Sequence, residues 1–347
     1  MGKVYIGISG WRYAPWRGVF YPHDLVQQRE LEFASRRLAS IEINGSFYSL
    51  QRPERYAAWY AATPPGFVFS TKGNRYITHI LRLHDIDKAL ANVFASGVFN
   101  LREKLGPFLW QFPPSFRYDP ERVEHFLSLL PHDTEAALEF TCRREPRMKG
   151  RSRLAIDLKR PLRHAMEIRH ESFVDESFVA MLRKYNVALV VADTAGKWPY
   201  REDVTADFMY LRLHGEEELY ASGYTEEALD RWAARIRAWS EGSEPADARR
   251  LSDVPPKRAS RDLYCYFDND AKVKAPFDAR RVIDKFGLTD GLAPFEWLGE
   301  PTVRERPRPA SARVRLFRPA RRPAMSPPPR GARAARGRSS TPRNRPA

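Results

Sequence analysis

The sequence predicts an α/β protein built as a closed (β/α)8 barrel of the TIM type. Short apolar segments of strand length recur eight times within about the first 300 residues, and most are followed by a loop and a helical pattern. This alternation is typical of a parallel sheet covered by helices, and eight repeats are the number that closes a barrel. A doubly wound open sheet is the alternative, but the first strand–helix connection has no G-x-G-x-x-G phosphate loop.

The expected elements follow one another in order along the chain. The expected strands are Val4–Ser9, Ser40–Asn44, Phe67–Lys72, Phe108–Phe112, Ala165–Arg169, Val187–Asp193, Phe208–His214 and Leu263–Phe267. The expected helices are Arg29–Leu38, Pro53–Ala62, Asp85–Leu105, Pro120–Leu130, Thr134–Arg147, Asp175–Tyr185, Thr225–Ser240 and Ala279–Lys285. Pro53 suits a first helical position, since its missing N–H would have no partner there.

The basic character of the chain is concentrated at its end. Residues 301–347 contain fourteen Arg, ten Pro and one acidic residue, Glu305, and so carry +13 of the net charge of +15, which leaves +2 for residues 1–300. We expect residues 1–300 to form the barrel domain, with 241–261 as an inserted loop on its bottom face. The tail should be disordered, because it has too few aliphatic residues to offset the entropy of ordering. It can bind polyanions through counterion release, or remain a solvated extension without a partner.

The sequence also indicates the cellular compartment in which the protein is expected. No segment approaches the roughly 20 apolar residues that span a bilayer, and the N-terminus enters a strand pattern directly. The two cysteines, Cys142 and Cys265, are too few for a disulfide framework. We therefore expect a cytoplasmic protein without a membrane partner.

Charged side chains recur at the predicted carboxyl ends of the strands. Met166 and Ile168 are apolar, so the period of two places Glu167 and Arg169 on the opposite, inner face. The same alternation in the other strands predicts a ring of carboxylates, cations and one histidine: Glu42, Glu167, Asp193, Asp268, Lys72, Arg169, Arg212 and His214. In a barrel these ends form the mouth that holds the active site. Opposed charges there shift one another's pKa values, which marks a candidate site.

These residue types suggest roles. Glu167, His214, Glu42 and Asp193 are the candidate general acids and bases. Three cations, Arg169, Arg212 and Lys72, suit an anionic group such as a phosphate, while amides can orient the ligand: Asn44, Gln111 and Asn269. Internal salt bridging, in which the charges neutralise one another, is the alternative interpretation.

Further candidates lie in the loops beyond the strand ends. Aromatic residues such as Trp11, Tyr13 and Tyr48 can stack on sugar rings or bases, although Trp16 and Phe20 equally suit a hydrophobic plug. Histidines useful for proton transfer follow two strands: His79 and His170.

A divalent metal is an alternative occupant of the mouth. Glu42, Glu167, Asp193 and His214 are chemically suited to ligate one, but the sequence has no local ligand motif such as H-E-x-x-H. We therefore predict no metal site, and the sequence identifies no cofactor.

Several short motifs resemble the YecE-like family, a domain of unknown function. They are Ile8-Ser9-Gly10-Trp11-Arg12-Tyr13 with Trp16, Glu42-Ile43-Asn44-Gly45-Ser46-Phe47-Tyr48, Lys72 with Thr78-His79, Gln111-Phe112-Pro113-Pro114, Glu167-Ile168-Arg169-His170, Tyr210-Leu211-Arg212-Leu213-His214-Gly215 and Tyr266-Phe267-Asp268-Asn269. The resemblance implies a TIM-type barrel over roughly residues 4–290 and brings no activity, substrate or cofactor. The chain departs from it at Phe173, where Trp is frequent, and at Asp268, where Asn is common.

Two functions remain open from the sequence. The first is an enzyme acting by acid–base chemistry at the mouth on a phosphorylated sugar- or nucleotide-like substrate, by hydrolysis, isomerisation or phosphodiester cleavage. The second is a non-catalytic nucleic-acid-associated protein that uses the basic tail.

Overall fold

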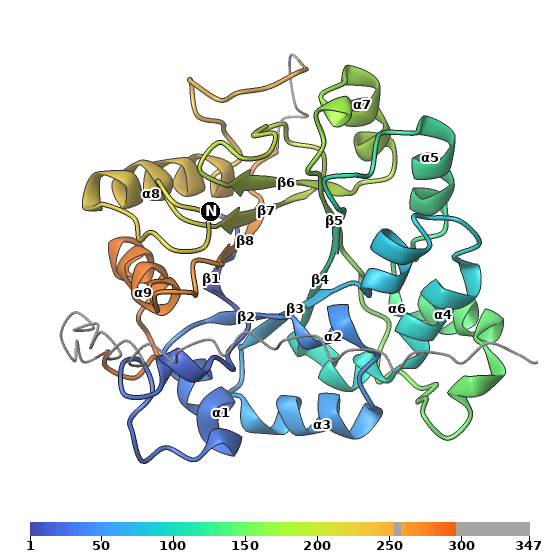
Figure 1. Cartoon of the computed structure of the whole chain (residues 1–347), viewed down its shortest axis with the longest axis horizontal. Helices are drawn as coiled ribbons and strands as arrows, with labels where there is room; N and C mark the ends of the chain where they lie inside the picture. Colours follow the sequence, from blue (N-terminus) through green and yellow to red (C-terminus); the bar gives the residue numbers. More distant parts are fainter. Residues whose placement is uncertain (253–257, 296–347) are drawn as a thin grey trace, which may run out of the picture. The chain divides into compact units, whose positions relative to one another are not determined.

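The computed structural model describes residues 1–252 and 258–295. Within them, eight parallel strands pair in chain order and β8 pairs with β1, so that the sheet closes into a barrel (Figure 1). The strands are β1 (Val4–Ser9), β2 (Ser40–Ile43), β3 (Val68–Lys72), β4 (Leu105–Gln111), β5 (His164–Glu167), β6 (Ala188–Asp193), β7 (Phe208–Leu213) and β8 (Asp262–Phe267). The predicted (β/α)8 barrel is confirmed, and the open sheet is excluded.

Helices surround the sheet on its outer side (Figure 1). They are α1 (Glu30–Ser35), α3 (Pro53–Ala62), α4 (Asp87–Ala95), α5 (Pro120–Ser128), α6 (Thr134–Phe140), α7 (Glu176–Lys184), α8 (Glu226–Ser240) and α9 (Ala275–Phe286). The short helix α2 (Gly45–Tyr48) lies in the connection between β2 and α3. Residues 194–207, between β6 and β7, contain no helix.

The strand alternation sorts side chains into two apolar layers. Ile41 and Ile43 of β2 belong to the large layer between the sheet and the helices. Tyr210 and Tyr266 belong to a smaller cluster inside the barrel. Burial of such apolar side chains is the main favourable term in folding. The alternation inferred from the sequence is therefore correct for these strands, and it brings the polar residues of the same strands into the barrel.

The predicted helix Asp85–Leu105 is interrupted. The α-helix α4 ends at Ala95, and Gly97 has a φ of 91°, a left-handed conformation that glycine adopts at helix ends. A short 3-10 segment, Val98–Lys104, follows, and Leu105 already belongs to β4. The apolar pattern of the sequence continues through this break, and such a pattern carries no information on the left-handed conformation of Gly97.

Two other helices differ from their predicted bounds. The segment predicted as Thr134–Arg147 is helical only to Phe140 and continues in short 3-10 turns. The last helix is longer than predicted and begins at Ala275, with Pro276 in its first turn. Neither difference moves a strand.

Part of the predicted inserted loop contacts the segment that precedes β7. The backbone N–H of Arg249 donates to Glu202, and those of Leu251 and Ser252 donate to Asp203. Both acceptors are fully buried, so these bonds satisfy carboxylates that would otherwise be costly.

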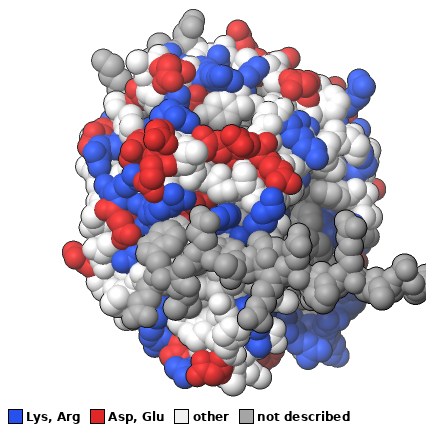
Figure 2. Space-filling view, turned by 60° about the vertical axis from the view of Figure 1, so that its left-hand side comes forward, with Lys and Arg blue, Asp and Glu red and all other residues white. Residues whose placement is uncertain are grey.

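Charges of both signs are interspersed on the side of the barrel that carries α8 and α9 (Figure 2). There, Arg281 and Glu226 lie 2.7 Å apart and Lys285 and Asp230 lie 2.6 Å apart. Exposed pairs of this kind contribute about 0–1 kcal/mol each.

In the described part of the chain, no helix has the length and apolarity that crossing a membrane requires. The predicted disordered tail, 301–347, lies outside the described residues.

Replacing Gly97 by Ala is expected to lower the free energy of unfolding by about 2–4 kcal/mol. Alanine is strained at this φ, and its Cβ would lie 2.7 Å from the Cα atom of Pro53. Gly66 is the matched control, because its φ is 79° and a Cβ there would meet nothing within 4 Å. Gly66→Ala should cost only about 1–2 kcal/mol in urea denaturation. Equal losses in the two variants would show that the approach of Pro53 is unimportant.

Candidate active site at the barrel mouth

Arg212, on β7, is the centre of the charged ring. Its side chain is fully buried, and its guanidinium contacts three carboxylates from three other parts of the barrel. It lies 3.0 Å from Glu42, 2.7 Å from Glu167 and 2.7 Å from Asp268. Guanidinium donors form strong, directional bonds with carboxylates. Arg212 therefore joins β2, β5, β7 and the end of β8.

Both carboxylate oxygens of Glu42 are occupied. Oε1 accepts hydrogen bonds from Ser9 Oγ at 2.6 Å and Arg212 Nη2 at 3.0 Å. Oε2 accepts from Tyr210 Oη at 2.6 Å and Arg212 Nε at 3.1 Å. The side chain is fully buried, so Glu42 serves the internal network. Its predicted role as a general acid or base is not supported by this placement.

Glu167 is held between two arginines. Its Oε1 lies 2.6 Å from Arg169 and its Oε2 lies 2.7 Å from Arg212. Burial alone would raise the pKa of Glu167, but the two guanidinium groups outweigh it and hold the pKa well below its usual range. Such a carboxylate is a weak base. Arg169 also stacks on Trp198, with Cζ 3.8 Å from the ring centroid.

Asp268 and His214 complete the network. Burial opposes ionisation of Asp268, yet Arg212 keeps its pKa well below the usual range. His214 is fully buried; burial and Arg212 lower its pKa, so the imidazole is neutral near pH 7. Its Nδ1 lies 3.1 Å from Asp268 Oδ2 without hydrogen-bond geometry.

Three predicted site residues lie elsewhere. Asp193 is two residues after Val191 in β6 and therefore lies on the side of the sheet that packs against the helices. Its carboxylate accepts a hydrogen bond from Tyr224 at 3.0 Å. Asn269 donates to Asp278 at 2.7 Å. His170 accepts from the Ser172 N–H and so caps a short 3-10 turn. These three side chains are therefore engaged outside the Arg212 network, and their predicted functional roles stay predictions.

A cavity of about 1400 Å³ opens above the network. Its walls come from the loops after β1, β2 and β3, from α3 and from the end of β3, with contributions from the ends of later strands. The described cationic residues that line it are Arg12, Arg52, Arg55, Lys72, Arg75, Arg151 and Arg169, whereas the acidic ones are Glu54, Asp268 and Asp270. This excess of cations favours an anionic occupant.

Two titratable groups on the cavity wall have pKa values moved toward neutrality. Burial and the cationic Arg212 lower the pKa of Lys72 to about 8. Burial and the charge of Asp268 raise the pKa of Asp270 to about 6. Groups displaced in this way are suited to proton transfer near pH 7. Asp270 was not predicted as a site residue from the sequence, although it lies two residues after Asp268 in the loop that follows β8.

Other predicted ligand-binding residues also line the cavity. They are Asn44, Gln111, Trp11, Tyr13, Tyr48 and His79. Tyr48 is 70% exposed at the rim. Burial and Arg169 lower the pKa of His79 to about 4, so this imidazole is neutral near pH 7.

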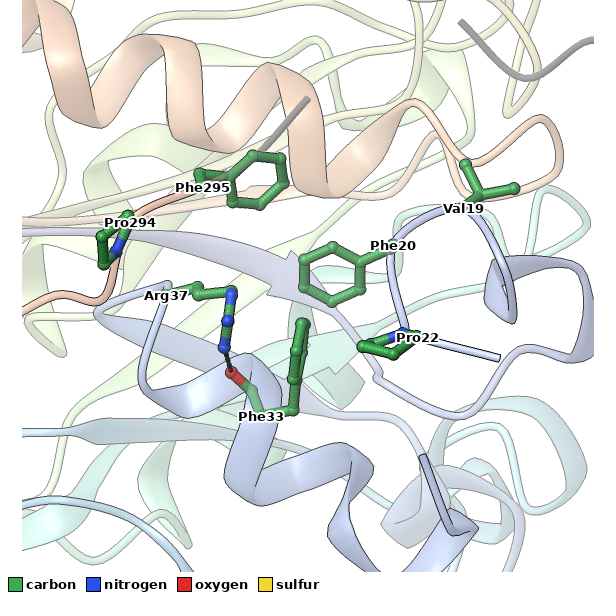
Figure 3. Close-up of a pocket in the computed structure, with 7 residues that line it drawn as sticks. All are labelled: Val19, Phe20, Pro22, Phe33, Arg37, Pro294 and Phe295. Carbon is green, nitrogen blue, oxygen red and sulfur yellow. Dashed lines mark hydrogen bonds between the residues drawn. The ribbon is translucent and has the colours of Figure 1, made fainter. Parts of the chain in front are cut away.

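The first long loop supplies a plug as well as cavity residues. Trp16 is fully buried, packs edge-on against Phe20 at 5.5 Å and donates to the Asp270 carbonyl at 3.2 Å. It thereby fixes the loop that carries Asp270. Phe20 lines a separate pocket of about 250 Å³ whose walls share no residue with the mouth cavity (Figure 3). The plug interpretation is correct for both aromatic residues.

Within residues 1–252 and 258–295, no group of three or more His, Cys, Asp or Glu side chains is arranged to hold a metal ion. The carboxylates proposed as alternative ligands, Glu42 and Glu167, face the Arg212 guanidinium instead.

Eight parallel strands around a charged, open mouth define the class of this protein: an α/β barrel with its candidate site at the carboxyl ends of the strands. Residues 5–300 match the family model described as "Protein of unknown function DUF72", and the chain belongs to this family. The YecE-like resemblance inferred from the motifs is confirmed.

Curated relatives and solved structures agree with this assignment. The chain is 24% identical to the UPF0759 protein YecE of Escherichia coli (strain K12) over 246 residues, which cover 70% of this chain and 84% of YecE. It is 29% identical to the UPF0759 protein YunF of Bacillus subtilis over 145 residues, and this match spans 40% of the chain and only 50% of YunF. A DUF72 family protein from Thermotoga maritima has a TM-score of 0.61 and 25% identity, covering 82% of this chain and 99% of that one. A DUF72 family protein from Enterococcus faecalis, 16% identical with a TM-score of 0.57 over 82% of this chain and 95% of that one, shares the fold.

Replacing Arg212 by Met is expected to lower the free energy of unfolding at pH 7 by about 3–5 kcal/mol, because it leaves buried carboxylates without a counter-charge. The pH dependence should also reverse. In the native protein the pKa values of Glu167 and Asp268 lie below their ordinary values of 4.5 and 3.8. Their stabilisation is therefore present above about pH 4.5 and is lost as the pH falls through the folded-state values.

In Arg212→Met the same carboxylates should have raised pKa values, so that the variant gains stability on acidification. Urea denaturation at pH 7 and pH 5 measures both effects. Arg231→Met is the control, since Arg231 is 66% exposed in its pair with Glu216 and should cost less than about 1 kcal/mol. A native-like Arg212→Met at pH 7 would contradict the network's structural role.

Proposed function

We propose that the barrel is an enzyme that binds an anionic, phosphorylated sugar- or nucleotide-like substrate in the mouth cavity and transforms it by acid–base chemistry. The observation that carries the proposal is the cationic excess of the cavity wall, seven Lys and Arg against three Asp and Glu among the described residues. Exposed guanidinium groups such as those of Arg12 and Arg75 suit a phosphate group, to which they donate bidentate hydrogen bonds.

The proton-transfer roles belong to Lys72 and Asp270 in this proposal. Both line the cavity, whereas Glu167 and His214 are fully buried in the network beneath it. With pKa values of about 8 and about 6, Lys72 is mainly protonated and Asp270 mainly ionised at pH 7. Lys72 is then the general acid and Asp270 the general base.

The aromatic lining supports a ring-containing substrate. Trp11 packs edge-on against Trp59 at a centroid distance of 5.3 Å, and both line the cavity together with Tyr48. Sugars and bases stack on such side chains. Cations beside aromatic rings thus match the two parts of a phosphorylated sugar or nucleotide.

A second candidate function is nucleic-acid binding. The mouth cavity exceeds the roughly 300–1,000 Å³ of ordinary small-molecule pockets. It also shares Tyr48, Arg52 and Arg151 with an adjoining groove of about 380 Å³ that adds Tyr76 and Arg147. A positively charged groove with aromatic platforms is typical of single-strand binding.

Substitution of two arginines of the cavity wall, Arg12 and Arg75, tests whether an anion binds specifically in the mouth cavity. The double variant Arg12→Ala/Arg75→Ala should bind adenosine monophosphate about ten-fold more weakly in titration calorimetry, since two charge-assisted contacts are lost. Arg36→Ala is the matched control: Arg36 directly follows α1, is half exposed and pairs with Glu32. Equal affinity in all three proteins would refute the anion site. Tighter binding of a ten-nucleotide single strand, lost in the double variant, would favour the second function.

The two wall groups predict how anion affinity depends on pH. We choose glucose 6-sulfate as the probe, because its charge is constant between pH 5 and pH 9. Its affinity should fall about five- to ten-fold over this range. Asp270 becomes negative as the pH rises through about 6, and Lys72 loses its charge as the pH rises through about 8. Asp270→Asn should abolish the lower step and Lys72→Met the upper one; a pH-independent affinity would contradict the assignment.

A further inference from the structure

Lys72 is a largely buried lysine whose amine has no acceptor among the described residues. It is the last residue of β3, its side chain is 8% exposed, and it lines the mouth cavity. Its Nζ lies 4.7 Å from the centroid of the Phe47 ring, and among the described residues it has neither a hydrogen-bond acceptor nor an ion-pair partner. Buried ammonium groups are normally paired, so this one requires an explanation.

Lys104 shows how the same chain treats a structural buried lysine. Its side chain is 4% exposed, and its Nζ donates to the Tyr60 carbonyl at 2.7 Å, the Thr63 carbonyl at 2.6 Å and Thr63 Oγ1 at 3.1 Å. These three acceptors satisfy the three donors of an ammonium group. Lys72 has no comparable arrangement, and its amine faces a cavity instead.

The groups around Lys72 explain why no carboxylate pairs with it. Glu42, Glu167 and Asp268 act on its charge from β2, β5 and the end of β8, but each is already bonded to Arg212. Arg212 itself repels the ammonium, and His79, a further titratable neighbour, is neutral near pH 7. A lysine beside another cation in a desolvated site is an activated nucleophile.

We propose that Lys72 is the nucleophile of the mouth cavity and forms a Schiff base with the carbonyl group of a phosphorylated aldehyde or ketone. The proposal rests on the anion site proposed above and narrows its substrate class. The phosphate group binds the wall arginines, and the carbonyl carbon meets Nζ. In this reaction Lys72 is the nucleophile in place of the general acid, and afterwards the iminium withdraws electrons from the substrate.

The reaction balances with the groups present. The lone pair of the neutral amine forms the C–N bond, and the carbonyl π electrons move to oxygen, which gains the proton that nitrogen loses. A second proton, which the Asp270 carboxyl or solvent supplies, lets this hydroxyl leave as water. The nitrogen lone pair then forms the C=N bond. The iminium carries the same +1 charge as the ammonium, so the three cations Lys72, Arg169 and Arg212 still balance the three carboxylates of the network.

The pKa of Lys72 makes the first step accessible near neutrality. At a pKa of about 8, about a tenth of the amine is unprotonated at pH 7, against fewer than about one in a thousand for an ordinary lysine. The reactive fraction should increase as the pH rises through about 8.

The test is covalent trapping on the full-length protein. Pyridoxal 5′-phosphate, an aldehyde with a phosphate group, is added at pH 7, the adduct is reduced with borohydride, and labelled lysines are identified by peptide mass spectrometry. Lys72 should be labelled about ten-fold or more faster than any exposed lysine. Lys104 should remain unlabelled, which shows that burial alone is not sufficient. Lys72→Arg and Lys72→Met should lose the label while keeping a native circular dichroism spectrum.

A second probe separates this inference from the anion site. Limiting formaldehyde with cyanoborohydride methylates reactive lysines without requiring phosphate binding. Preferential methylation of Lys72 in a protein that pyridoxal 5′-phosphate fails to label would support the nucleophile and overturn the phosphorylated substrate class. Reversible, Arg12- and Arg75-dependent binding of pyridoxal 5′-phosphate without a reduced adduct at Lys72 would overturn the nucleophile and leave the anion site standing. Labelling of exposed lysines alone by both probes would also overturn it.

Discussion

The candidate site depends on one guanidinium group, that of Arg212, which is shared by three carboxylates. Arg212 is bonded to Glu42, Glu167 and Asp268 in the fully buried centre of the barrel mouth. Taking ions out of water is costly, and the cost is recovered only where geometry is good and the remaining donors are satisfied. The planar guanidinium meets both conditions, because its donors point toward three carboxylates and Ser9. This network also determines which charges remain available, since each carboxylate that binds Arg212 is withdrawn from Lys72.

The mouth is consequently divided into two layers. The lower layer holds Glu42, Glu167 and His214, which are fully buried and bonded to one another through Arg212 or packed beside it. The upper layer lines the cavity and contains Lys72 and Asp270. The internal salt-bridge interpretation and the active-site interpretation, alternatives at the level of sequence, thus describe different depths of the same mouth. The carboxylates of the lower layer are paired with Arg212. Reactivity is proposed for the upper layer, where Lys72 has no ion-pair partner among the described residues.

The strand alternation explains how much could be predicted. Periodicity of two located Glu42, Glu167, Arg212 and Asp268 correctly, because their neighbours in the strands are large apolar residues that require the helix-facing side. The barrel could also be predicted, because eight buried strands that alternate with helices are typical of this closed sheet. Its position at a strand end does not tell on which side of the sheet Asp193 lies; two residues after Val191, it lies on the same side as that valine, which packs against the helices. Pairing within the ring, and the presence of Asp270 in the wall, depend on how far opposite strands are apart, which no local pattern records.

Asp268 shows how one residue connects the two layers. The YecE-like pattern commonly has Asn at this position, and an amide would leave Arg212 with two carboxylates. The charge of Asp268 raises the pKa of Lys72 and also that of Asp270. Without it, both pKa values would be lower, so that the amine would be less protonated and the carboxyl more ionised at a given pH. The aspartate therefore moves the pKa of Asp270 toward neutrality, whereas for Lys72 it partly offsets the lowering of the pKa by burial and Arg212. The residue at which the chain departs from the YecE-like pattern thus acts electrostatically on both wall groups.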